Sequence, residues 1–122
     1  MRDFKRLEVW KQGHTLTLDC YRASEQLPVD ENFGLRSQLR RAAASIPINI
    51  AEGCGHSSQR QFARYLRDAL ASSNEVEYQL LLLRDVSLLD AQIHAKLHRQ
   101  TCEVRRMLLA LLKRVQPPPA QP

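Results

Sequence analysis

The feature that most constrains the fold is a mostly apolar repeat between residues 62 and 83. Its members alternate between spacings of four and three residues: Phe62, Leu66, Ala69, Ser73, Val76, Leu80 and Leu83. This spacing puts side chains on one face of an α-helix and is typical of a seam between packed helices. The repeat therefore predicts a long helix that begins after Ser58, which forms a capping box with Gln61. The run from Leu80 to Leu83 predicts a turn that is buried on every side.

Composition extends this prediction to the whole chain of 122 residues. Leucine occurs 19 times and alanine 12 times, whereas valine occurs 6 times and isoleucine 4 times. Leucine and alanine favour helices, and β-branched residues favour strands. The 4 glycines are too few to form the turns of many hairpins. We therefore expect an all-α protein.

Three further helices are predicted. The first covers about residues 7–26 and ends before Pro28, because proline disfavours a helical residue in front of it. It carries two neighbouring stripes, which is more contact surface than one partner helix needs. These are Leu7, Trp10, His14, Thr17 and Tyr21, and beside them Val9, Gly13, Leu16, Cys20, Ala23 and Leu27.

The second predicted helix covers residues 35–52, with Asp30 or Asn32 as its cap. Gly53 and Gly55 are expected to end it in the left-handed conformation. The fourth helix is expected to be capped by Asp90 and to bury one seam. The seams of these two helices are Leu35, Leu39, Ala42, Ile46 and Ile50, and Ile93, Leu97, Val104, Leu108, Leu111 and Val115.

Four amphipathic helices with short connections predict an antiparallel up-and-down four-helix bundle over residues 1–116. The Pro-rich residues 117–122 are expected to be a disordered tail. The sequence has no apolar stretch long enough to span a membrane and no apolar core of a signal peptide near its start. Its 3 cysteines are odd in number and far apart, which favours reduced thiols in the cytoplasm.

Pro47 lies inside the apolar period of the second helix. It cannot donate a backbone hydrogen bond to Ala43, so we expect a kink there rather than a break. Asn49 is expected to satisfy the backbone that Pro47 leaves free, and Glu52 to pair with an arginine such as Arg41. A functional site at this end of the helix is the alternative interpretation.

The same helix carries a family resemblance. Residues 40–43 (RRAA), 45–47 (SIP) and 49–53 (NIAEG) resemble the signature of bacterial four-helix bundle proteins, also called 23S rRNA intervening-sequence proteins. Residues 3–4, 7–10, 62–66 and 84–85 agree as well, so the resemblance covers most of residues 3–114. Ser45, Pro47, Asn49, Glu52 and Gly53 are the structural motif that it assigns.

The resemblance implies a cytosolic bundle that assembles as a ring-shaped homopentamer. Some members of the family are encoded inside intervening sequences of large-subunit ribosomal RNA genes. A related branch accompanies diversity-generating retroelements, as a basic subunit that binds nucleic acid and a reverse transcriptase. Most members have no assigned activity. The sequence does not decide between a ribosomal intervening sequence, a retroelement and neither as the setting of this chain.

Basic residues are concentrated in two segments of this chain, whose formal net charge is +5. Residues 33–67 hold Arg36, Arg40, Arg41, Arg60, Arg64 and Arg67 against one acidic residue. Residues 90–114 form a secondary patch with Lys96, Arg99, Arg105, Arg106, Lys113 and Arg114 against two acidic residues. Arginine at helical spacing suits phosphate, which predicts low-specificity contacts to RNA or DNA. The alternative is a scaffold whose arginines serve subunit interfaces and bind no nucleic acid.

Other chemistry has weaker support in the sequence. His94, His98 and Cys102 are spaced four apart, but the first and last lie about 12 Å apart along a helix, too far for one metal ion. A metal would need ligands from elsewhere, such as Cys54 or His56, so we expect an exposed or interface stripe and no metal. No paired carboxylates, nucleophile elbow, phosphate-binding glycine loop or HExxH motif is present, so we expect neither an enzyme, nor a cofactor, nor a small-molecule substrate.

Overall fold

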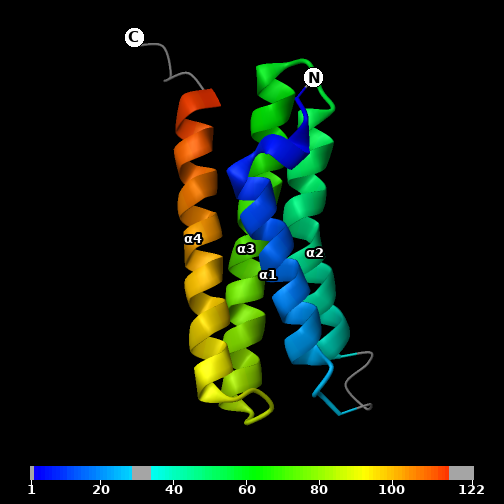
Figure 1. Cartoon of the computed structure of the whole chain (residues 1–122), viewed down its shortest axis with the longest axis vertical. Helices are drawn as coiled ribbons and strands as arrows, with labels where there is room; N and C mark the ends of the chain where they lie inside the picture. Colours follow the sequence, from blue (N-terminus) through cyan, green and yellow to red (C-terminus); the bar gives the residue numbers. More distant parts are fainter. Residues whose placement is uncertain (1, 29–33, 116–122) are drawn as a thin grey trace.

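Four α-helices account for most of the described residues (Figure 1). The computed structural model describes residues 2–28 and 34–115, and these contain no β-strand. The elements are the short 3-10 helix η1 (Phe4–Arg6), α1 (Glu8–Ser24), α2 (Leu35–Cys54), α3 (Gln59–Asp85) and α4 (Ala91–Val115). The all-α prediction is confirmed. The predicted cap residues Asp30 and Asn32 and the predicted tail 117–122 lie outside the described residues.

The helices run antiparallel to their neighbours and form an up-and-down bundle (Figure 1). Within the described residues, α1 packs against α2 and α4, and α3 also packs against α2 and α4. The α2–α3 seam is the most extensive of the four, and the α1–α4 seam the least. The antiparallel four-helix bundle expected from the sequence is therefore the observed fold of one chain.

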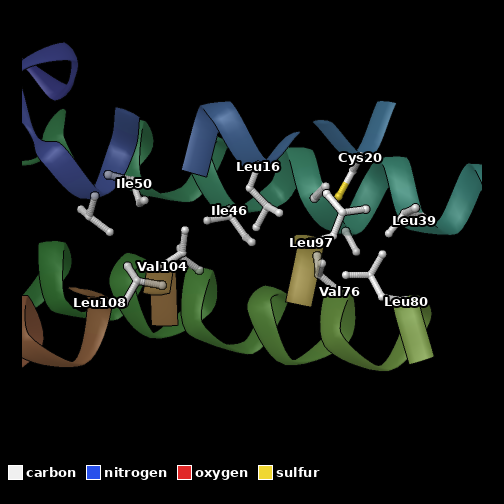
Figure 2. Close-up of a cluster of buried hydrophobic side chains, with 14 of the residues drawn as sticks. Leu16, Cys20, Leu39, Ile46, Ile50, Val76, Leu80, Leu97, Val104 and Leu108 are labelled. Carbon is white, nitrogen blue, oxygen red and sulfur yellow. The ribbon is translucent and has the colours of Figure 1, made fainter. Parts of the chain in front are cut away.

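Aliphatic side chains from all four helices fill the centre of the bundle (Figure 2). Leu16 of α1, Ile46 of α2, Leu80 of α3 and Leu108 of α4 each have 0% of their surface exposed. Burying one such side chain contributes about 1.5–3 kcal/mol. Every member of the predicted α3 seam is buried, as the alternating spacing requires.

The predicted burial is wrong at other positions, including Leu35 of the α2 seam, which is only partly buried. In α4, Ile93 and Leu111 are only partly buried, whereas His94 and Leu112 are buried. In α3, Leu81 is 36% exposed, so the turn from Leu80 to Leu83 is not buried on every side. The helical period predicts which side of a helix is buried. Which residues at the edges of that side are also buried depends on the neighbouring helices.

Only one of the two stripes predicted on α1 is fully used inside the chain. The stripe of Val9, Gly13, Leu16, Cys20, Ala23 and Leu27 is buried. In the other stripe, Thr17 is buried, Trp10 is half-buried, and His14 and Tyr21 are exposed. The indole of Trp10 stacks on the His14 ring, with centroids 5.0 Å apart. The expected surplus of contact surface on α1 is therefore present.

Two helices, α3 and α4, begin at the capping side chains that the sequence predicts. Ser58 Oγ accepts a hydrogen bond from the Gln61 backbone N–H at 3.2 Å, and Asp90 Oδ1 accepts one from Gln92 at 2.6 Å. The prediction for the glycines was wrong. Gly53 lies inside α2, and Gly55 has φ −75°, so neither is left-handed. α2 instead ends because Gly55 and His56 turn back to bond the carbonyl groups of Glu52 and Gly53.

Candidate nucleic-acid interface

The first three predicted arginines surround one hollow at the start of α2. Arg36, Arg40 and Arg41, together with Ser37 and Tyr21 of α1, line a space of about 340 Å³. We call Arg36, Arg40 and Arg41 the α2 arginine cluster. Arg41 is exposed, whereas Arg36 is half-buried and its buried Nε atom has no hydrogen-bond partner in the described part of the chain. Three guanidinium groups and a hydroxyl around one hollow are suited to an anion.

Arg40 is held in place at the end of α1. Its Nε donates to Ser24 Oγ at 2.6 Å, and its Nη2 lies 3.4 Å from the carbonyl oxygen of Tyr21. Its guanidinium carbon also lies 4.8 Å from the centre of the Tyr21 ring. These partners are neutral, and no carboxylate pairs with Arg40 within residues 2–28 and 34–115. A cation at the carboxyl end of a helix also interacts favourably with the helix dipole.

The other three predicted arginines gather at the start of α3. Arg60, Arg64 and Arg67, which we call the α3 arginine cluster, line a space of about 530 Å³ with Ser58 and Gln61. Arg60 and Arg64 are exposed. The amino end of a helix carries partial positive charge, so this position also favours an anion.

The two arginine clusters lie toward opposite ends of the bundle. Arg36 is the second residue of α2 and Arg60 is the second residue of α3, and these helices begin at opposite ends (Figure 1). A helix rises about 1.5 Å per residue, so the 20 residues of α2 span about 30 Å. The six arginines that are close in the sequence therefore line two different hollows rather than one.

Half of the basic residues in the secondary patch on α4 pair with carboxylates in the described part of the chain. Arg105 Nη2 lies 2.7 Å from Glu77 Oε1, and Lys96 Nζ lies 3.9 Å from Asp19 Oδ2. Arg106 pairs with Glu103 at 2.5 Å, and this hydrogen bond lowers the pKa of Glu103. Arg99, Lys113 and Arg114 have no ion pair among residues 2–28 and 34–115. This patch is therefore a weaker candidate for phosphate than the two arginine clusters.

The motif around Pro47 has a structural explanation. α2 continues through Pro47 without a break. Asn49 Nδ2 donates to the carbonyl oxygen of Ser45 at 2.9 Å, and Ser45 Oγ lies 2.6 Å from Ser72 Oγ of α3. Asn49 therefore does not satisfy the carbonyl group of Ala43, as the sequence had suggested. Thr17 of α1 does so instead, with its Oγ1 2.9 Å from that oxygen.

The other two motif residues also differ from expectation. Glu52 is exposed and forms no ion pair with Arg41 in the described part of the chain. Gly53 faces α3, where a Cβ atom at this position would lie 2.9 Å from Tyr65 Cβ. Gly53 thus permits a close approach of two helices, which explains why a side chain is missing there.

The histidine stripe on α4 divides between core and surface. His94 is 8% exposed, and burial lowers its pKa, with the charge of Arg84 as the next cause. His98 and Cys102 are half-buried and lie next to Glu77 of α3. The suggested additional ligands, Cys54 and His56, are not part of this group. Sequence reasoning missed Glu77 because its place opposite α4 depends on how two helices pack.

None of the described helices is long and apolar enough to cross a membrane.

Comparisons with known proteins agree with this architecture. The family model described as 23S rRNA-intervening sequence protein matches residues 5–110. Among solved structures, the chain is similar to a protein of unknown function from the S23 ribosomal protein family of Bacteroides thetaiotaomicron. The TM-score is 0.81 at 24% sequence identity, and the match covers 86% of this chain and 98% of the other. At that identity the likeness concerns the fold alone. No curated protein matches the chain.

Proposed function

Because the chain belongs to the 23S rRNA-intervening sequence protein family, we propose that it acts without catalysis, as a homo-oligomeric bundle that binds nucleic-acid phosphate. One observation carries the proposal: within the described residues, several arginine charges pair with no carboxylate. In the described residues, no ion pair involves Arg36, Arg40, Arg41, Arg60 or Arg64. The 3 free cysteines support a reducing compartment such as the cytoplasm.

Phosphate is the ligand that best fits the two arginine clusters. A guanidinium group can donate two parallel hydrogen bonds to phosphate oxygens, and each cluster places three guanidinium groups around one hollow. Phosphate contacts position a protein on nucleic acid but carry no sequence information directly. The proposed binding therefore has low sequence specificity and depends strongly on salt.

A fluorescence anisotropy titration tests this proposal. The parent chain and the double variant Arg60→Gln, Arg64→Gln are titrated into labelled single-stranded RNA and duplex DNA at several salt concentrations. The control is the double variant Arg6→Gln, Lys11→Gln, which removes two exposed cations that already pair with Asp3 and Glu8 and lie outside both basic segments. Both variants lower the formal net charge of +5 by two.

We expect the parent to bind both nucleic acids and the Arg60→Gln, Arg64→Gln variant to bind more weakly than the control. The slope of log affinity against log salt is negative, and each lost phosphate contact reduces its magnitude by roughly 0.9 for duplex DNA. The magnitude for the test variant should thus be about 1.8 smaller than for the parent, whereas the control should keep the parental slope. Absence of binding by the parent at low salt would reject the proposal and leave the scaffold interpretation.

The proposed assembly is a homopentamer, which rests on the family resemblance and on apolar surface that one chain leaves uncovered. Ile48, Tyr78 and Leu109 are 57%, 59% and 50% exposed. On α1, Leu18 and Tyr21 are 41% and 40% exposed. Each of the four helices thus leaves a large apolar side chain that another protein could cover. A second copy of the chain is the partner we propose.

Sedimentation equilibrium tests the assembly. We expect a mass close to five times the 14.0 kDa chain, and a shift toward smaller species for Ile48→Glu. The control variant is Ala95→Glu, which adds the same charge at an exposed position of α4. A parent protein that sediments as a monomer at all concentrations would contradict the proposed assembly, and a closed assembly with another copy number would correct it.

A further inference from the structure

Three side chains with metal-binding atoms meet on the outer face of α3 and α4. Glu77 belongs to α3, and His98 and Cys102 lie one turn apart on α4. One ligand atom from each lies within 4.8 Å of the ligand atoms of the other two. We propose that Glu77, His98 and Cys102 bind one Zn²⁺ ion at this surface.

The distances support a common site. Cys102 Sγ lies 3.5 Å from His98 Nε2, and Glu77 Oε2 lies 3.8 Å from His98 Nδ1. In tetrahedral zinc sites the metal–ligand distances of about 2.0–2.3 Å put neighbouring ligand atoms roughly 3.3–3.8 Å apart. The two distances go to different nitrogens of His98, and a single set of ligand atoms lies within 4.8 Å of one another. One His98 nitrogen must therefore turn to the ion, and the three ligand atoms must draw together by up to about 1 Å to reach this spacing.

The chemistry of the three ligands favours zinc over harder cations. Thiolate, imidazole and carboxylate are the ligand types that zinc takes in proteins, whereas Ca²⁺ and Mg²⁺ prefer oxygen alone. Binding converts the Cys102 thiol into a thiolate as the sulfur–zinc bond forms, and the proton passes to solvent. Glu77 and His98 are 37% and 42% exposed, so the ion can enter, and water fills the fourth position.

Arg105 fixes the orientation of Glu77. Its Nη2 donates to Glu77 Oε1 at 2.7 Å, which leaves Oε2 on the side of His98. A partner that holds a ligating carboxylate in this way is typical of metal sites. The ring of His94 lies 5.8 Å from that of His98 in a stacked arrangement, and His94 is outside the ligand group. The spacing argument against a site that includes both His94 and Cys102 thus remains valid.

A cobalt titration tests this site. Co²⁺ is added to the reduced, untagged full-length chain, and near-ultraviolet and visible absorption are recorded. We expect one equivalent to bind, with a thiolate-to-cobalt charge-transfer band and the visible bands of a tetrahedral ion, and Zn²⁺ to displace it. The variants are Cys102→Ser, His98→Ala and Glu77→Gln. The control is His14→Ala, which removes an exposed histidine on α1.

Cys102→Ser should lose the charge-transfer band, and His98→Ala and Glu77→Gln should bind Co²⁺ at least tenfold more weakly. His14→Ala should bind as the parent does. Circular dichroism without metal establishes that each variant is folded. A parent chain without the charge-transfer band, or a band that persists in Cys102→Ser, would overturn the proposed site. Either result is independent of nucleic-acid binding.

Discussion

The hydroxyl oxygen of Thr17 on α1 lies 2.9 Å from the carbonyl oxygen of Ala43 on α2. In a regular helix this carbonyl group would accept a hydrogen bond from the residue at position 47, but Pro47 has no N–H. Both Thr17 and Ala43 are buried, so water cannot replace the lost donor. The Thr17 hydroxyl also lies 2.8 Å from the carbonyl oxygen of Gly13, so two carbonyl oxygens are within reach of its single hydrogen. A side chain of α1 thus compensates for a proline in α2.

Replacing Thr17 by valine tests this compensation. Thr17→Val keeps the shape of the side chain but leaves the Ala43 carbonyl group buried without a donor. An unsatisfied buried polar group costs about 1–3 kcal/mol, and we expect the free energy of unfolding in urea to fall by that amount.

The double variant isolates the cause. Pro47→Ala restores a backbone N–H that can reach the Ala43 carbonyl group, so Thr17→Val should cost about 1 kcal/mol less in that background. Equal costs in both backgrounds would show that the hydroxyl does not act through Pro47. Pro47→Ala by itself also tests whether the proline is required for stability and assembly.

Replacing Gly53 by alanine should destabilise the protein more than the same replacement at Gly55. A Cβ atom at Gly53 would lie 2.9 Å from Tyr65 Cβ and 3.0 Å from Phe62 Cδ1, whereas one at Gly55 meets only Glu52 O at 3.3 Å. We expect Gly53→Ala to lower the free energy of unfolding by about 1–3 kcal/mol, because overpacking forces the helices apart. Thermal melts with Gly55→Ala as the comparison measure this. A smaller loss at position 53 than at position 55 would refute the close-approach argument.

Replacing Ser87 by glycine should stabilise the protein. Ser87 has φ 63°, in the left-handed region, where glycine has no steric penalty. The Leu88 N–H bonds to the Leu83 carbonyl oxygen at 2.9 Å, and the Ser87 N–H to that of Arg84 at 3.0 Å, so α3 ends in a Schellman motif. Ser87→Gly should raise the free energy of unfolding by about 0.5–1 kcal/mol. Chemical denaturation measures it, and the exposed Ser57→Gly is a control without this benefit.

Sequence periodicity predicts the helices of this protein well and their contacts poorly. The α3 repeat fixes which face is buried, because that depends only on residues within one helix. The partner of the Ala43 carbonyl group is Thr17, 26 residues away on another helix, whereas the sequence suggested the nearby Asn49. The division of the arginines between two ends of the bundle and the position of Glu77 beside His98 likewise depend on how helices pack. No period along a single helix contains that information.

The buried thiol of Cys20 should make the folded protein less stable at alkaline pH. Burial raises the pKa of this thiol to about 12, with the Asp19 carboxylate as the second cause. In the unfolded chain the thiol titrates near its ordinary pKa of 9.0, so above that pH the unfolded state loses a proton that the folded state keeps. The stability that the protonated Cys20 thiol contributes is therefore complete below pH 9 and is lost as the pH rises toward its folded-state pKa of about 12.

Urea unfolding of the parent and of Cys20→Ala at pH 7 to 11 measures this effect. The parent should lose about 2–3 kcal/mol between pH 9 and 11 from this thiol, beyond what other groups contribute to both proteins. Cys20→Ala should start about 1 kcal/mol less stable at pH 7, because the buried sulfur leaves a small cavity, and then fall less steeply. Parallel pH profiles for the two proteins would mean that the Cys20 thiol ionises as easily in the folded chain as in the unfolded one.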